Sequence, residues 1–340
     1  MGKALSSAGV PSASDPDWSP WTPLPGLPRL TPAVLAETLD GGQAFRWNRI
    51  ESSDASAPPS VDARPRPPTS DTRWRGLWSD HLAELRLDPH GTVEWRAPSV
   101  IASRVAAALP VYFATAQDFA ALADALPWRS DPHLAQCLAA FPGLRLLRQP
   151  FGETLLGFLC SATKQIVQIK QMLALLAERH GAAIVAGPST LNLKPSTRDA
   201  AHRLPTWPEL ARIPESDLRA CLLGFRARYI AETARFLAAH PGWLEETESL
   251  PYAAAKERLC SLPGVGEKVA DCVLLFGAGK LEAFPVDVWI LKTLARRYGL
   301  ENWKPAQLTQ FGRAHFGPLA GLAQQYLFAW ERAAGRAEKV

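Results

Sequence analysis

The sequence lacks the cysteine patterns of a disulfide framework or a zinc site. Its 340 residues include five cysteines, an odd number, widely spaced and without a CxxC pair: Cys137, Cys160, Cys221, Cys260 and Cys272. Disulfide-rich domains and structural zinc sites need paired or closely spaced cysteines. We therefore expect all five to be reduced thiols.

Long apolar runs and a strong charge of either sign are also missing. No run of about eighteen apolar residues, the length that a membrane-spanning helix needs, occurs in the chain. The first residues, MGKALSSAGVPSASDPDW, lack the apolar core of a secretory signal, so we expect an intracellular protein without a membrane segment. The net charge of +4 is mildly basic, which permits nucleic acid as a partner without requiring it.

The composition along the chain predicts an α+β protein with two structured parts. Residues 1–25 and 51–71 are rich in small, polar and proline residues, which predicts a disordered tail and a disordered loop. Alternating stretches such as QAFRWNRI and TVEWRA predict an antiparallel β-sheet domain over 26–128. From 129 to 340 the apolar spacing is mainly helical, so we expect a helical body there.

The stretch LPGVGEKVA predicts a glycine hairpin between two helices. Gly264 and Gly266, on either side of Val265, permit positive φ values and a close approach of the backbone to a ligand. The next helix begins with unpaired N–H groups, which can bind a DNA phosphate without reading the base sequence. We therefore predict a helix-hairpin-helix over about 253–279, with a plain turn between two capped helices as the alternative.

Lys268 and Asp287 are the candidate catalytic pair. Lys268 lies in the first turn of the second helix, away from its apolar face, and an unprotonated lysine amine is a nucleophile. Asp287 precedes the helical pattern VWILKTLARRYG, so its simplest role is that of an N-cap. A carboxylate fixed at a helix start can also assist proton transfer or stabilise positive charge on a sugar. A solvated lysine is the alternative for Lys268.

Seven segments of the sequence together resemble a known family. They are GGQAFRW, FPGLRLLRQ, LCSATKQI, LLGFRARYIAETA, LPGVGEKVADC, PVDVW and FGPLAGLAQQYLF. In this order they resemble the helix-hairpin-helix DNA glycosylases, and most of all the eukaryotic-type 8-oxoguanine DNA glycosylase/AP lyases. The resemblance implies an N-terminal antiparallel sheet domain, similar to the TATA-binding protein, packed on a helical body. The related endonuclease III carries an iron–sulfur cluster after its helices, whereas this chain has no cysteine beyond Cys272, so we expect no cofactor.

The resemblance also implies a reaction on DNA. Lys268 would attack C1′ of the damaged nucleotide, expel the base and form a Schiff base, and Asp287 would assist. β-Elimination would then cleave the strand, so the resemblance implies a monomeric, bifunctional enzyme acting on double-stranded DNA that contains a damaged purine.

Four residues match base-binding positions of the family. The backbone carbonyl of Gly42 would accept the N7 hydrogen that 8-oxoguanine has and guanine lacks. Gln324 would read the edge of the base, while Phe328 and Cys272 would contact its two faces. Taken singly, each has an ordinary alternative: a turn glycine, a surface amide and two helix core residues.

The sequence departs from the family at some positions that match DNA contacts. Thr163 and Gln168 replace an asparagine and an arginine that contact the cytosine opposite the lesion, whereas Arg226 retains the third such contact. Phe225 replaces a tyrosine that wedges into the gap left by the flipped base, and Trp289 replaces a histidine near the lesion's phosphate. The preference for the opposite base is therefore left open by the sequence.

Two other functions are compatible with these residues. A glycosylase of the same superfamily could act on alkylated purines or oxidised pyrimidines. A protein without catalysis could use the hairpin only to bind DNA, although DNA binding alone requires neither Lys268 nor Asp287.

Overall fold

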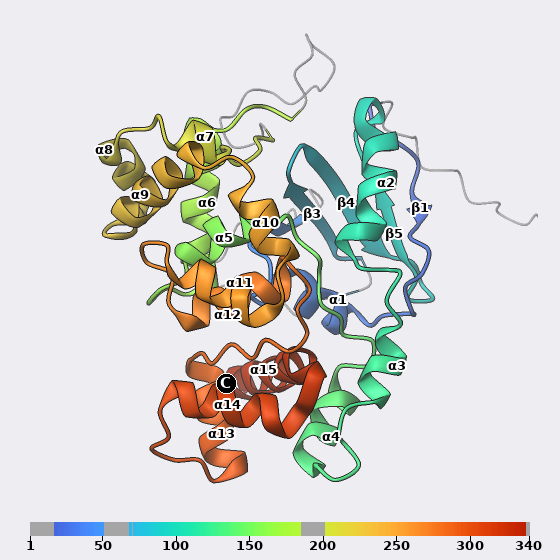
Figure 1. Cartoon of the computed structure of the whole chain (residues 1–340). Helices are drawn as coiled ribbons and strands as arrows, with labels where there is room; N and C mark the ends of the chain where they lie inside the picture. The colour runs from blue at the N-terminus through green and yellow to red at the C-terminus, as the bar shows by residue number, and fades with distance from the viewer. Residues whose placement is uncertain (1–16, 51–67, 70, 185–200, 338–340) are drawn as a thin grey trace, which may run out of the picture.

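An antiparallel sheet packs beside a larger helical body in the computed structural model (Figure 1). The structure describes residues 17–50, 68–69, 71–184 and 201–337. Residues 1–16 of the predicted tail and most of the predicted loop 51–71 lie outside the described residues. None of the helices in the described ranges is both long and apolar enough to cross a membrane.

Five strands form the predicted antiparallel sheet, in the spatial order β1-β5-β4-β3-β2. Their bounds are β1 (Thr22–Pro23), β2 (Trp47–Ile50), β3 (Arg73–Trp78), β4 (His81–Leu87) and β5 (Val93–Arg96). Burial alternates along β3 and β5, as expected for strands with one face on the core. Helix α2 (Ala102–Tyr112) packs on β4 (Figure 1), and the indole N–H of Trp47 donates to the Tyr112 hydroxyl over 3.0 Å.

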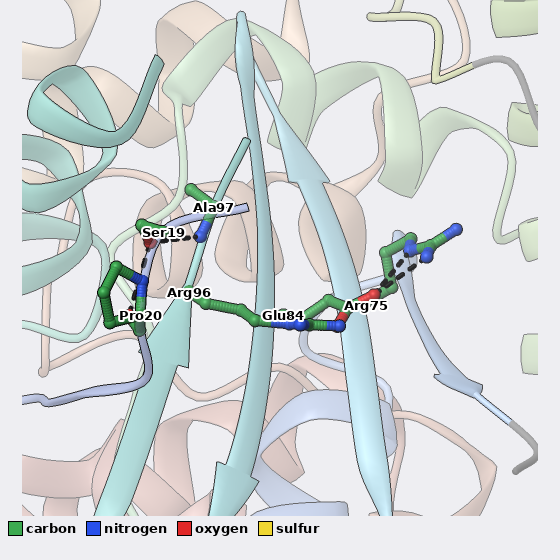
Figure 2. Close-up of polar contacts among 6 residues, drawn as sticks. All are labelled: Ser19, Pro20, Arg75, Glu84, Arg96 and Ala97. Atoms are coloured by element: carbon green, nitrogen blue, oxygen red, sulfur yellow. Dashed lines mark hydrogen bonds and ion pairs between the residues drawn. The ribbon is translucent and has the colours of Figure 1, made fainter. Parts of the chain in front are cut away.

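The other face of the sheet carries a buried acid between two arginines. Glu84 on β4 faces Arg75 on β3 and Arg96 on β5 in the strand register. Its carboxylate pairs with both guanidinium groups, at 2.8 Å and 2.7 Å (Figure 2). Because a buried charge is costly unless it is paired, these cross-strand contacts tie three strands together.

The predicted tail ends earlier than residue 25. Residues 17–25 are described, with Trp18 bridged to Pro98 and β1 paired with β5. Trp18 lies under the guanidinium of Arg96, with 4.9 Å between Cζ and the ring centroid, and Trp21 stacks on the same group. These cation–π contacts cover the charged face of the sheet. They could not be predicted from the sequence because the segment has a low apolar content.

The remaining elements are helices, and most of them form the helical body. The first helices are α1 (Pro32–Asp40), η1 (Ser99–Ile101), α3 (Phe119–Asp124), α4 (Pro132–Ala140), α5 (Phe151–Leu159), α6 (Ile166–His180), α7 (Trp207–Leu210), α8 (Glu215–Leu218), η2 (Arg219–Leu223) and α9 (Arg226–Ala239). They are followed by α10 (Trp243–Ser249), α11 (Tyr252–Cys260), α12 (Glu267–Phe276), α13 (Val288–Tyr298), α14 (Pro305–Phe316), η3 (Gly317–Leu319) and α15 (Ala320–Ala337). A turn over residues 160–165 separates α5 from α6.

Two glutamines join the turn after α1 to the helical body. The side-chain amide of the buried Gln43 donates to the Arg145 carbonyl over 3.1 Å and accepts from the Leu147 N–H over 2.8 Å. Gln149 donates its side-chain amide to the Gln43 carbonyl over 2.5 Å, and its backbone N–H donates to the Phe276 carbonyl over 2.8 Å. The turn at Gly42 is thus linked to the end of α12.

Candidate active site

Helices α11 and α12 form the predicted helix-hairpin-helix. Gly264 has φ +77°, and a Cβ there would lie 2.6 Å from Cδ2 of Tyr229, so glycine is required for both conformation and space. Val265 between the glycines is buried and anchors the turn. Of the two glycines that permit a positive φ, only Gly264 has one: the φ of Gly266 is −91°, and this residue caps α12. Nothing lies within 4 Å of a Cβ built on Gly266, so this side of the hairpin is open to a ligand.

Lys268 lies in the first turn of α12, as predicted, and contacts α5 and the turn that follows it. Its ammonium group donates to the Ser161 hydroxyl over 3.3 Å and lies 5.3 Å from the centre of the Phe158 ring. Apolar neighbours of α12 such as Val273 and Leu274 are buried on the opposite side. The lysine is therefore half-buried with its amine at the edge of the helical core.

Asp287 caps α13, as predicted. Its carboxylate accepts from the N–H of Trp289 over 3.0 Å and from the N–H of Ile290 over 2.9 Å. Enclosure of this carboxyl group raises the pKa of Asp287 above its ordinary value, although the two N–H donors and the charge of Lys268 oppose the shift. The acid is thus held in one orientation, in a site where ionisation is penalised.

A cavity of about 430 Å³ opens between the turn after α1 and the helices α5, α6, α12, α13 and α15. This volume falls in the range of small-molecule sites. Lys268 and Asp287 both line it, and so do all four predicted base-binding residues: Gly42, Cys272, Gln324 and Phe328. The structure thus gathers six residues, spread over nearly 290 positions of the chain, around one space.

The Gly42 turn and Phe328 form one side of the cavity. Gly42 has φ +105°, and a Cβ there would lie 3.0 Å from Cδ1 of Ile166 and 3.5 Å from Cζ of Phe328. Within the described ranges no hydrogen-bond donor meets the Gly42 carbonyl. Glycine is therefore required at this turn, and its carbonyl can accept a bond from a ligand.

Gln324 brings an unsatisfied polar atom to the cavity. The residue is 4% exposed, and its Oε1 has no hydrogen-bond partner in the part of the chain that the structure describes. A buried amide oxygen without a partner costs free energy, which a ligand with a suitably placed N–H would recover. The alternative that Gln324 is a surface amide is wrong, because its side chain points from α15 into the interior and lines the cavity.

Cys272 faces the cavity from α12 as a neutral thiol. Burial raises the pKa of Cys272 to about 12, with the nearby charge of Lys268 acting against this shift. A thiol that keeps its proton is a small apolar contact surface rather than a nucleophile. This property suits contact with the face of a flat ring.

The predicted contacts to the opposite strand lie together at the turn between α5 and α6 and at the start of α9. Arg226 is buried and donates to the Ala162 carbonyl and, over 3.0 Å, to the Thr163 hydroxyl. Its guanidinium lies 4.3 Å from the centre of the Phe225 ring, which is 51% exposed. Gln168 is exposed and accepts the N–H of Gln165 at the start of α6. In this arrangement Phe225 and Gln168 are accessible to DNA, while Arg226 supports the turn.

Thr163 has a backbone conformation that the sequence does not reveal. Its φ is +55°, a region that β-branched residues rarely adopt. The Arg226 guanidinium holds both its hydroxyl and the preceding carbonyl, so the strained turn is fixed by a buried cation.

Trp289 also lines the cavity, but its ring packs on α15. A Cβ built on Gly335 would lie 2.8 Å from Cζ3 of Trp289, so the indole packs closely against this glycine of α15. The lining also includes residues for which the sequence suggested no role, among them Phe45, Phe158, Ser161, Ile166 and Arg332. Lys164 and Gln165, which the sequence places near Thr163, line the cavity too. Ser161, Lys164, Gln165 and Ile166 all belong to the segment LCSATKQI, so its resemblance to the family could have identified them as cavity residues.

Comparison with known proteins places these features in a family. Residues 157–315 match the model of the HhH-GPD superfamily base excision DNA repair proteins, and residues 29–155 match the N-terminal domain of 8-oxoguanine DNA glycosylase. The chain is 30% identical to N-glycosylase/DNA lyase OGG1 of Arabidopsis thaliana over 321 residues, 88% of this chain and 78% of that protein. It is 32% identical to the probable N-glycosylase/DNA lyase of Methanothermobacter thermautotrophicus over 231 residues, 64% of this chain and 72% of that protein.

A solved structure gives the same result. The 8-oxoguanine glycosylase/lyase of Clostridium acetobutylicum, in complex with double-stranded DNA containing cytosine opposite 8-oxoguanine, superposes with a TM-score of 0.74 at 26% identity. The alignment covers 94% of this chain and 99% of that chain. Fold and hairpin thus define a helix-hairpin-helix base excision repair protein. Within that superfamily, the chain belongs to the 8-oxoguanine DNA glycosylase family.

Proposed function

We propose that this protein is a bifunctional DNA glycosylase and AP lyase that removes 8-oxoguanine from double-stranded DNA. One observation carries the proposal: Lys268 and Asp287 line the same cavity as the four predicted base-binding residues. The relatives named N-glycosylase/DNA lyase and 8-oxoguanine glycosylase/lyase support it. A protein that repairs cellular DNA acts inside the cell.

The damaged base must leave the duplex before it can enter the cavity. Flipping costs a few kcal/mol, and the exposed Phe225 ring can fill the gap that the base leaves. The open face of the hairpin at Gly266, with the N-terminus of α12 beside it, binds the DNA backbone. These contacts do not depend on sequence, so recognition of the lesion falls to the cavity.

In the cavity, the base lies between Phe328 and Cys272. The Gly42 carbonyl accepts the hydrogen on N7, and the unpaired Oε1 of Gln324 accepts an N–H from the edge of the base. Guanine has no hydrogen on N7 and would place its own acceptor against the carbonyl. Discrimination therefore depends on one backbone oxygen, whose position the φ of Gly42 sets.

Base removal begins at the amine of Lys268. The unprotonated amine attacks C1′, the bond from C1′ to N9 breaks, and the departing base takes up a proton. Opening of the sugar ring then gives an imine between Nζ and C1′. Asp287 stabilises the positive charge that develops at the sugar, because its carboxylate is fixed by the first N–H groups of α13.

Strand cleavage follows from the imine. The iminium withdraws electrons and acidifies the hydrogen on C2′. Loss of that proton forms a double bond between C2′ and C3′ and expels the 3′ phosphate. Water then hydrolyses the imine and releases Lys268. An enzyme that activates water instead of an amine forms no imine, so it would need no such step.

Borohydride trapping tests the proposal. The wild-type protein, incubated with a duplex that contains 8-oxoguanine and then reduced, should form a covalent adduct with DNA. Lys268→Gln should form none, whereas the control Lys280→Gln, in the turn that follows α12, should trap normally. An adduct with Lys268→Gln at wild-type yield would overturn the mechanism.

A substrate panel separates this function from its alternatives. We expect faster excision of 8-oxoguanine than of alkylated purines or oxidised pyrimidines in the same duplex. Faster release of an alkylated purine would favour the other glycosylase activity. An intact strand at an abasic site after long incubation would favour a protein that only binds DNA.

A further inference from the structure

Helix α15 holds the Gly42 turn through a buried arginine. We propose that Arg332 is a positioning residue for lesion discrimination: it fixes the end of α1, and with it the Gly42 carbonyl, against Phe328. The inference rests on the proposed function, since it concerns how the same cavity distinguishes 8-oxoguanine from guanine.

Within the described ranges, the hydrogen bonds that the Arg332 side chain donates all go to the last turn of α1. Nη2 donates to the Glu37 carboxylate over 2.8 Å, and both Nη1 and Nη2 donate to the Asp40 carbonyl over 3.2 Å. The side chains of Arg332 and Glu37 are only 9% and 8% exposed. A cation removed from water in this way is stable only with well-oriented partners, so this geometry is sharply defined.

Asp40 is the last residue of α1, and Gly42 follows two positions later. The carbonyls at the end of a helix have no partner within the helix and carry the negative end of its dipole. Arg332 supplies both the hydrogen bonds and the positive charge that this end needs. The path of the chain through Gly41 and Gly42 therefore begins from a fixed point.

Arg332 also lies under the aromatic side of the cavity. Its Cζ is 6.0 Å from the centre of the Phe328 ring, one helical turn away on α15. Phe328 in turn lies against Gly42, at 3.5 Å from a Cβ built there. One guanidinium thus bonds the helix end that leads into the Gly42 turn and lies near the ring that packs against this turn.

The other sides of the turn are held by different groups. Lys170 on α6 pairs with the Asp40 carboxylate over 2.8 Å and donates to the Trp47 carbonyl over 2.6 Å. Gln43 binds the backbone of Arg145 and Leu147. In the part of the chain that the structure describes, neither Lys170 nor Gln43 bonds to α15. Arg332 does link this turn to α15, the helix that carries Phe328 and Gln324.

Lysine or leucine cannot replace this connection fully. The planar guanidinium bonds a carboxylate and a carbonyl at once, whereas the ammonium of a lysine is a compact charge without the fixed fork. Leucine would fill much of the volume but would leave the Asp40 carbonyl and the Glu37 carboxylate without this donor. We expect Arg332→Leu to disturb the turn and Arg332→Lys to retain part of its position.

The experiment compares two activities of one protein. Single-turnover excision of 8-oxoguanine is divided by single-turnover cleavage at a preformed abasic site in the same duplex. Cleavage at the abasic site uses Lys268 but no base contact. A loss of folded protein lowers both rates equally, whereas displacement of the Gly42 carbonyl lowers only excision. For Arg332→Leu we expect the ratio to fall roughly three- to tenfold, the worth of one hydrogen bond, and for Arg332→Lys by less.

Control variants keep the test decisive. Arg296→Leu removes another ion pair to α15, from the exposed Arg296 to Glu331, and should leave the ratio unchanged. Glu37→Gln weakens the Arg332 contact without a new cavity and should lower the ratio, so it replaces Arg332→Leu if that variant does not fold. A ratio equal to wild type in Arg332→Leu, or in Glu37→Gln as its substitute, overturns the role of Arg332. Absence of both activities from the wild-type protein instead overturns the proposed function.

Discussion

The two hairpin glycines make a sharp test, because one should fail through stability and the other through DNA binding. In Gly264→Ala, an L-residue is forced to φ +77° and its Cβ is placed 2.6 Å from the Tyr229 ring. The left-handed conformation costs about 1–2 kcal/mol, and overpacking adds about 1–3 kcal/mol. The free energy of unfolding should therefore fall by about 2–5 kcal/mol.

Gly266→Ala should have the opposite profile. Its φ of −91° suits alanine and nothing lies within 4 Å of the new Cβ. Such a change stabilises a protein by about 0.4–1 kcal/mol through the unfolded chain. The methyl group would, however, occupy the space where a phosphate approaches. Loss of one charged hydrogen bond costs about 1.5–3 kcal/mol, or about one to two orders of magnitude in Kd.

Thermal melts by circular dichroism and fluorescence anisotropy with a labelled duplex measure the two effects. Gly299→Ala serves as the control, since Gly299 has φ +67° with no neighbour within 4 Å and ends α13. It reports the conformational cost alone, so the difference between Gly264→Ala and Gly299→Ala isolates the Tyr229 contact. Wild-type affinity in Gly266→Ala would refute the phosphate-binding role, and wild-type melting of Gly264→Ala would refute the packing argument.

Three further substitutions or modifications follow from the cavity. Burial raises the pKa of Asp287, so ionisation of its carboxyl group opposes folding at neutral pH and has no effect below the pKa that the group has in the unfolded chain. Asp287→Asn should therefore melt at a higher temperature than wild type at pH 7 and lose this advantage as the pH falls below about 4. The same variant should lose excision. Equal melting temperatures at pH 7 would contradict this. Gln324→Leu removes a buried acceptor without a partner, so we expect unchanged or slightly higher stability, by up to about 1 kcal/mol, with at least a tenfold loss of excision; normal excision would exclude base reading by this amide. With a pKa of about 12, Cys272 should resist iodoacetamide at pH 8 in the native protein and react after unfolding, as peptide mass spectrometry can show; rapid labelling of the native protein would show an exposed thiolate instead.

The positions of Lys268 and Asp287 and the existence of the sheet could be predicted because they follow from local patterns. Lys268 falls in a first helical turn set by the glycines before it, and the N-cap role of Asp287 follows from the helical spacing after it. The alternation of buried residues along the strands likewise identified the sheet. In these places the local pattern is enough to identify the element.

Other features depend on contacts between distant segments and could not be predicted. The positive φ of Thr163 is held by Arg226, 63 positions later, and no local signal marks it. The sequence permitted a positive φ at both hairpin glycines but could not show that only Gly264 adopts one, nor that its backbone lies against the Tyr229 ring. The contact of Trp18 with the sheet arginines was missed because a tryptophan in a polar segment has no periodicity to read.

Gln149 connects two walls of the cavity through hydrogen bonds. Its side-chain amide donates to the Gln43 carbonyl, next to Gly42, and its backbone N–H donates to the Phe276 carbonyl in the last turn of α12. A ligand that displaced the Gly42 turn would therefore also act on the end of α12, the helix that carries Lys268.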